Sequence, residues 1–195
     1  MFYIFYGPEG SGKTTQARLL AEHLKLPLLI SGDLVREAVK KDKGLIGKAC
    51  RQALFTGHYV PSSEMFVLWK KRLKKPDVQQ GWVMDGFPRN LTQVDFLERK
   101  LDKYGHQITK VFYLEVSEKE SLKRLLKRKR RLDSGELHDS PERIRGRLKE
   151  YKKSNKLILK YYQKLGLLKI IDGERPIKTI FKDILKFLNY QKKKK

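Results

Sequence analysis

Residues 7 to 14, GPEGSGKT, constrain the fold of this chain more than any other stretch. They match the pattern G-x-x-x-x-G-K-T, in which glycines allow consecutive backbone N–H groups to curl around a phosphate chain. An apolar run, FYIFY (2–6), precedes the loop, and KTTQARLLAEHLKL (13–26) follows with helical spacing. A strand, a loop and a helix in this order predict a phosphate-binding loop, with Lys13 on the terminal phosphates. The alternative is a glycine-rich turn that binds nothing.

The rest of the chain alternates short apolar runs with helical patterns, which predicts an α/β fold of the P-loop NTPase type. We expect a parallel sheet of about five strands with helices on both faces. The predicted strands are 2–6, 27–31, 82–85, 111–116 and 167–172. The predicted helices are 13–24, 33–41, 47–56, 62–74, 91–103, 118–128, 141–164 and 176–190. Asp33 and Ser117 are predicted N-caps.

Such sheets bind ligands beyond the carboxyl ends of their strands. Gly7, Ser31, Asp85 and Ser117 all follow a predicted strand and are therefore expected at that edge. The stretch GWVMDGFPRN (81–90) adds two chemical groups there. Asp85 suits the waters around a bound Mg²⁺, and the planar guanidinium of Arg89 can grip a phosphate with two parallel hydrogen bonds. The alternative is a turn with a surface arginine.

Length and composition indicate one domain in a reducing compartment. The chain has 195 residues, a single cysteine (Cys50) and no apolar run of membrane-spanning length. We expect a cytoplasmic protein without a membrane partner. The net charge of +23 would suit a nucleic-acid partner, but the lysines are dispersed apart from the runs 123–131 and 192–195. A nucleic-acid partner is therefore not expected.

Five segments together resemble the adenylate kinase family. GPEGSGKTTQ (7–16), SGDLVRE (31–37), TGHYVP (56–61) and DGFPRNLTQ (85–93) have that family's order and spacing, and DGERP (172–176) resembles its donor-adenine turn. The resemblance covers nearly the whole chain. It implies a core of 1–30, 61–128 and 141–190, a monophosphate-binding helical segment at 31–60, a short lid at 129–140 and a basic tail at 191–195.

The resemblance also implies a role for individual residues. Those implied to be catalytic are Lys13, Arg89, Arg124, Arg128 and Arg147. Those implied to bind ATP are Gly7, Gly10, Ser11, Gly12, Lys13, Thr14, Thr15, Arg124, Arg128, Arg175 and Pro176. Those implied to bind AMP are Ser31, Gly32, Arg36, Val60, Gly86, Arg89, Gln93 and Arg147. Mg²⁺ would be held by Asp85 and by Thr14 or Thr15, largely through water.

The implied activity is reversible phosphoryl transfer from ATP to AMP, with Mg²⁺ and without zinc, by a monomer whose partners are small nucleotides. Gln93 offers a donor and an acceptor, which suits the edge of adenine. Asn90, however, is shared with the similar UMP/CMP kinases, so another nucleoside monophosphate remains an alternative acceptor. A further alternative is an adenylate-kinase-like ATPase associated with RNA or ribosome assembly.

Several positions depart from the family pattern. Thr14 replaces a glycine, and Glu9 replaces a proline, which puts an anion near the phosphates. In the lid, Glu136 stands where an arginine is expected and His138 where an aspartate is expected. We expect Arg130 or Arg131 to swing over the transferred phosphate instead.

Overall fold

The computed structural model describes residues 1–129, 131 and 139–192, and within them it confirms the predicted α/β fold. The five strands are β1 (Phe2–Tyr6), β2 (Leu28–Ile30), β3 (Trp82–Asp85), β4 (Lys110–Glu115) and β5 (Leu168–Asp172). The helices are α1 (Lys13–Leu24), α2 (Ser31–Lys41), α3 (Leu45–Thr56), α4 (Ser62–Leu73), α5 (Leu91–Asp102), α6 (Glu118–Arg128), α7 (Pro141–Lys164) and α8 (Ile177–Lys192), with a 3₁₀ turn, η1 (Pro76–Val78), before β3.

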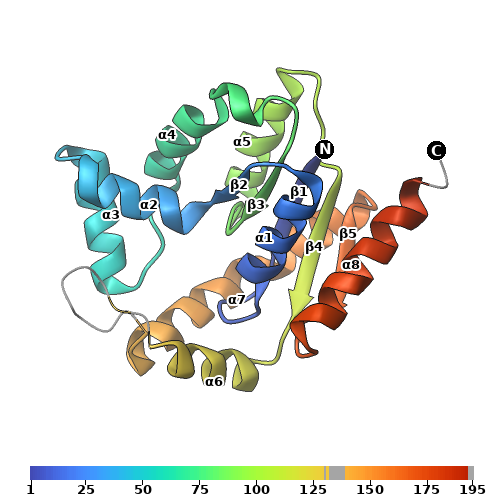
Figure 1. Cartoon of the computed structure of the whole chain (residues 1–195). Helices are drawn as coiled ribbons and strands as arrows, with labels where there is room; N and C mark the ends of the chain where they lie inside the picture. The colour runs from blue at the N-terminus through green and yellow to red at the C-terminus, as the bar shows by residue number, and fades with distance from the viewer. Residues whose placement is uncertain (130, 132–138, 193–195) are drawn as a thin grey trace.

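The strands form one parallel sheet in the order β2-β3-β1-β4-β5 (Figure 1). Its central strand is β1, which pairs Phe2 with Trp82 on one side and Tyr3 with Lys110 on the other. All five residues of β1 are buried. That burial explains why the strand is a continuous apolar run and not an alternating one, because both faces of a parallel sheet are covered.

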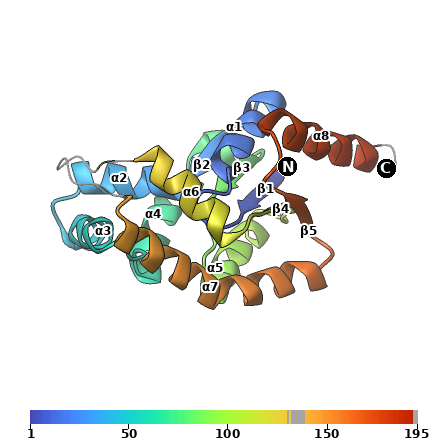
Figure 2. The same ribbon diagram turned by 90° about the horizontal axis from the view of Figure 1, so that it is seen from below.

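Side chains of β1 alternate between two cores, one on each face of the sheet. Tyr3 and Phe5 pack with α1 and α8, whereas Phe2, Ile4 and Tyr6 pack in the larger core with α4, α5 and α7. Figure 2 shows these layers, with α1 and α8 above the sheet and α5 and α7 below it. Helices α2 and α3 extend to one side of the sheet beside α4 (Figure 1). The carboxyl ends of the strands are therefore positioned by a sheet that is packed on both faces.

The predicted cap at Asp33 was wrong. Helix α2 begins at Ser31, directly after β2, with Ile30 at the N-cap position, so Asp33 lies in its first turn. An acidic residue there still favours the positive end of the helix dipole. The predicted cap at Ser117 was right, because its side chain accepts a hydrogen bond from the backbone N–H of Glu120.

None of the helices in the described part of the chain is long and apolar enough to cross a membrane.

Candidate active site

The loop between β1 and α1 has the backbone shape that its glycines predict. Gly7 has φ +148°, and a Cβ there would come within 2.7 Å of the carbonyl oxygen of Leu114, so only glycine fits. Gly12 has φ +87° and directly precedes α1. Gly12, Lys13, Thr14 and Thr15, at the N-terminus of α1, line a cleft of about 620 Å³. The first N–H groups of a helix have no partner within the helix and can bind phosphate.

Lys13 lies at this loop and is largely withdrawn from solvent. Its Nζ donates a hydrogen bond to the carbonyl oxygen of Pro8 over 3.1 Å. Burial lowers the pKa of Lys13, although the nearby carboxylates of Asp85 and Glu9 partly offset the shift. Lys13 lines the cleft, and its ammonium group is hydrogen-bonded to a neutral carbonyl group. A phosphate anion would bind it more strongly.

Asp85 ends β3 beside the first turn of α1. Thr14 Oγ1 donates to Asp85 Oδ2 over 2.5 Å, and within the described residues Asp85 Oδ1 has no hydrogen-bond partner. The residue is 3 % exposed, and burial raises the pKa of its carboxyl group. A buried carboxylate oxygen without a partner, next to a hydroxyl group, fits a Mg²⁺ ion that is otherwise held by water and phosphate. In the described ranges no group of three or more acidic, histidine or cysteine side chains is arranged so that it could hold a metal ion by itself.

Arg89 follows β3 and is fixed by three contacts. Its Nε donates to the carbonyl oxygen of Gly86 over 2.9 Å, its backbone N–H donates to Gln93 Oε1 over 2.8 Å, and its guanidinium carbon lies 3.8 Å from the ring centroid of Tyr59. Arg89 lines the cleft. Burial would lower the pKa of Arg89, but the surrounding tyrosines and carboxylates raise it, so the group keeps its charge.

The residues predicted to bind the acceptor nucleotide gather around Arg89. Ser31, Gly32, Arg36, Val60, Gly86 and Gln93 all line the same cleft. A Cβ at residue 32 would lie 3.1 Å from the Arg36 guanidinium, so the glycine permits that close approach. Ser31 Oγ is buried and has no partner within the described part of the chain.

Three arginines predicted to be catalytic approach from α6 and α7. Arg128 makes two hydrogen bonds to Asp139, of 2.8 and 2.9 Å, and Arg147 makes one of 3.0 Å to the same carboxylate. Arg147 also pairs with Glu9 in the phosphate-binding loop over 2.9 Å. Arg124 donates to the carbonyl oxygen of Gly173 over 2.9 Å, so its guanidinium lies against the predicted donor-adenine turn. All three arginines line the cleft.

Only some of the other predicted donor-site residues line the cleft. Gly10, Gly12, Lys13, Thr14 and Thr15 line it, whereas Gly7 and Ser11 belong to the loop but not to the lining. Arg175 pairs with Asp183 over 2.7 Å and with Asp172 over 3.3 Å, and neither Arg175 nor Pro176 lines the cleft. Their contacts with adenine stay a prediction.

The lid prediction falls largely outside the described residues. Arg130, Glu136 and His138 lie there, and Arg131 is exposed and does not line the cleft. The expected swing of Arg130 or Arg131 stays a prediction.

Two side chains of the site were missed from the sequence. Tyr59 lies under Arg89, and Asp139 joins Arg128 to Arg147. Glu9, which the sequence marked as an anion near the phosphates, pairs with Arg147 and does not point away from the site. Tyr59 and Asp139 act through partners that only the fold brings close.

Comparison with known proteins places these features in one family. The family model described as "Adenylate kinase" matches residues 5–167. The chain is 33 % identical to an adenylate kinase of Archaeoglobus fulgidus, over 94 % of this chain and 96 % of that protein. It is 37 % identical to adenylate kinase 1 of a Nostoc species (88 % and 90 % covered) and 36 % identical to adenylate kinase 1 of a Synechocystis species (95 % of each).

Proposed function

The chain belongs to the adenylate kinase family, and on that premise we propose that it transfers a phosphoryl group reversibly from ATP to AMP, which gives two ADP. One observation carries the proposal. Lys13 and Thr14 enter the cleft from the phosphate-binding loop, Arg36 and Arg89 line it as well, and Arg128 and Arg147 reach it from α6 and α7. Two sets of phosphate-binding groups in one cleft suit the transfer of a phosphoryl group between two nucleotides.

The donor would lie along the N-terminus of α1. The loop residues Gly10 and Gly12 and the side chain of Lys13 would hold its phosphates, and Arg124 would pack on its adenine. The support for Arg124 is its position against the 172–176 turn, where its Nη2 also donates to the carbonyl oxygen of Glu174 over 3.4 Å. A planar guanidinium in that place offers a stacking surface for a base.

The acceptor would lie on the 31–60 segment, with its phosphate on Arg36 and Arg89. Arg36 pairs with Asp33 over 2.5 Å on the exposed side of α2, so a phosphate would compete with a weak surface partner. Gln93 would meet the base. Its Oε1 accepts from the Arg89 backbone and its Nε2 donates to Ser62 Oγ over 3.1 Å, so the orientation of its amide group is fixed before the base arrives.

Mg²⁺ would be held by Asp85 and Thr14, with phosphate oxygens and water as its other ligands. The ion would neutralise charge on the donor phosphates. The acceptor phosphate oxygen is already a nucleophile, so the reaction needs no strong general base. What the protein supplies is position and positive charge, from Lys13, Arg89, Arg128 and Arg147, and closure of the cleft against water.

A coupled assay of ADP formation tests the proposal. The purified protein is given MgATP together with AMP, CMP, UMP or no monophosphate. We expect AMP to be used at least about 10²-fold better than the pyrimidine nucleotides in kcat/KM, because a pyrimidine presents a different hydrogen-bonding edge to the fixed amide of Gln93. A higher value with CMP or UMP would assign a pyrimidine nucleotide kinase. ADP formed at the same rate without any monophosphate would assign an ATPase.

We propose that the protein is a monomer, as the resemblance to the family implies. Light scattering of the protein in the assay buffer would test this part of the proposal.

A further inference from the structure

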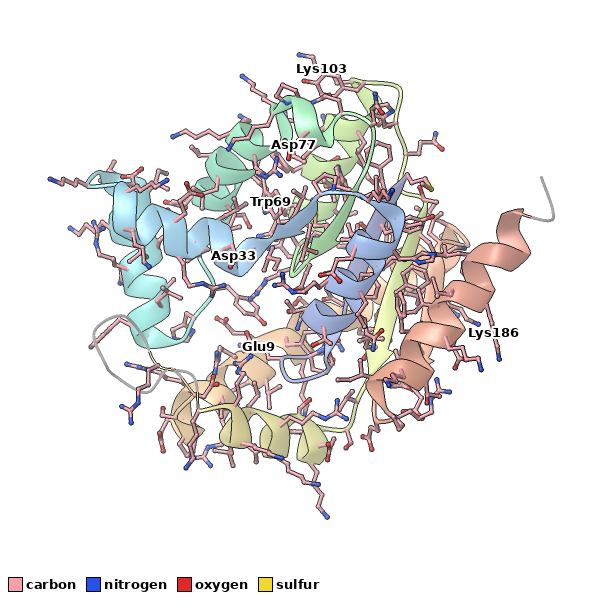
Figure 3. The ribbon with its side chains drawn as sticks, in the orientation of Figure 1. Glu9, Asp33, Trp69, Asp77, Lys103 and Lys186 are labelled. Atoms are coloured by element: carbon pink, nitrogen blue, oxygen red, sulfur yellow. The ribbon has the colours of Figure 1, made fainter. Side chains whose placement is uncertain are left out.

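Glu9 places a carboxylate inside the phosphate-binding site. It lies in the loop that leads into α1, close to the ribbon of α7 (Figure 3). Its side chain is 18 % exposed, and its Oε2 is 2.9 Å from Nη1 of Arg147, whose own side chain is 4 % exposed. Arg147 is therefore held by Glu9 on one side and by Asp139, over 3.0 Å, on the other. The family pattern has an uncharged proline at residue 9, so this contact is a property of the present chain.

Nearby cations keep Glu9 ionised, and they are the same cations that we propose bind nucleotide phosphate. Burial acts to raise the pKa of Glu9, but Arg147, Arg89, Lys13 and Arg128 outweigh it and bring the pKa below its ordinary value. Glu9 is consequently ionised at neutral pH. A partly buried carboxylate that pairs with Arg147 and feels three further cations compensates the same positive charge that a phosphate group would compensate.

We propose that Glu9 is a tethered counter-ion that competes with nucleotide phosphate for Arg147. The proposal rests on the function proposed above and describes how that site is regulated. In the empty protein, Glu9 neutralises Arg147 and holds it at the cleft. When nucleotide phosphates occupy the transfer site between donor and acceptor, two anions compete for one guanidinium, so the phosphates displace Glu9 and take over Arg147.

Competition of this kind has opposite effects on the empty and the occupied protein. The contact between Glu9 and Arg147 stabilises the empty protein, because it pairs a buried guanidinium. It weakens nucleotide binding, because the same contact must break first. Removal of the charge should therefore lower the Tm of the empty protein and tighten nucleotide binding. A residue that only supports the loop would lower the Tm and leave the affinity unchanged or weaker.

The test is calorimetric titration of wild type and Glu9→Gln with an ATP analogue that carries a nitrogen bridge between the β and γ phosphates, in the presence of Mg²⁺. We expect the dissociation constant to fall about tenfold in Glu9→Gln, which corresponds to about 1.4 kcal/mol. The control is Asp95→Asn, the same change in an exposed carboxylate that pairs with Arg99 over 2.8 Å on α5. It should bind the analogue as wild type does.

The melting curve of each variant in the absence and presence of the analogue completes the experiment. Glu9→Gln should melt at a lower temperature than wild type when empty, and the analogue should raise its Tm by more. If Glu9→Gln does not fold, Glu9→Ala is titrated in its place, with the same expectation. An unchanged or higher dissociation constant would overturn the proposal. Wild type that binds no analogue would instead overturn the proposed function, so the two failures are distinguishable.

Discussion

Tyr59 is predicted to orient Arg89 through its ring. The guanidinium carbon of Arg89 lies 3.8 Å from the ring centroid, and both side chains are half-buried. A cation over an aromatic face contributes about 0.5–1 kcal/mol when exposed and about 2 kcal/mol when desolvated. Because both side chains are half-buried, we place the stabilisation from this contact between those values, at about 1.4 kcal/mol. If the contact is made in the transition state, this free energy corresponds to about tenfold in rate. Tyr59→Leu should therefore lower kcat/KM for the acceptor about tenfold.

The phenol oxygen should matter little, because the ring makes the contact. Burial raises the pKa of Tyr59 to about 12, so the hydroxyl group stays neutral and adds no charge beside Arg89. We expect Tyr59→Phe to remain within about twofold of wild type in the coupled assay. The double variant Tyr59→Leu/Arg89→Ala should be no slower than Arg89→Ala alone, because the ring acts only through the guanidinium. The reasoning is refuted if Tyr59→Phe loses as much activity as Tyr59→Leu, or if the two losses add in the double variant.

Three further predictions concern the same cleft. Arg89→Ala should lower kcat on the order of 10²-fold or more, because Arg89 holds the acceptor while charge develops on the transferred phosphoryl group. If steady-state kinetics show a change in KM alone, Arg89 contributes only to binding. Asp85→Asn should raise the Tm at pH 7 without Mg²⁺. Burial raises the pKa of Asp85 in the folded protein, so its ionised form opposes folding at every pH above the pKa of an unfolded aspartate. A lower Tm of the variant in differential scanning fluorimetry would argue against this. Asp139→Asn should lower the free energy of unfolding by roughly 3 kcal/mol in urea, because it removes the buried negative charge that both Arg128 and Arg147 contact. A loss below about 1 kcal/mol would show that the carboxylate is replaceable.

The parts of this molecule that could be predicted from the sequence are those that local patterns determine. The glycines at 7, 10 and 12 and the apolar run before them specify a strand, a loop and a helix within a dozen residues. The start of α2 was misplaced because an acidic residue at position 33 is equally suited to an N-cap or to a first turn, and only the short β2 strand decides between them.

The charge network of the site could not be predicted, because its members are distant in the sequence. Glu9 and Arg147 meet only after α7 has packed beside the loop, and Tyr59 reaches Arg89 from a different segment. A pattern can say that a side chain is charged and near a phosphate site. It cannot say which of several cations the carboxylate will face, since that depends on the packing of helices.

Phosphoryl transfer between the two nucleotides can be observed with a labelled phosphate. The purified protein is incubated with Mg²⁺, AMP and ATP labelled with ³²P at the γ-phosphate, and the products are separated by chromatography. We expect the label to move to the β-phosphate of ADP, and unlabelled ADP alone to be converted into ATP and AMP. Label recovered as inorganic phosphate, with none in ADP, would contradict it.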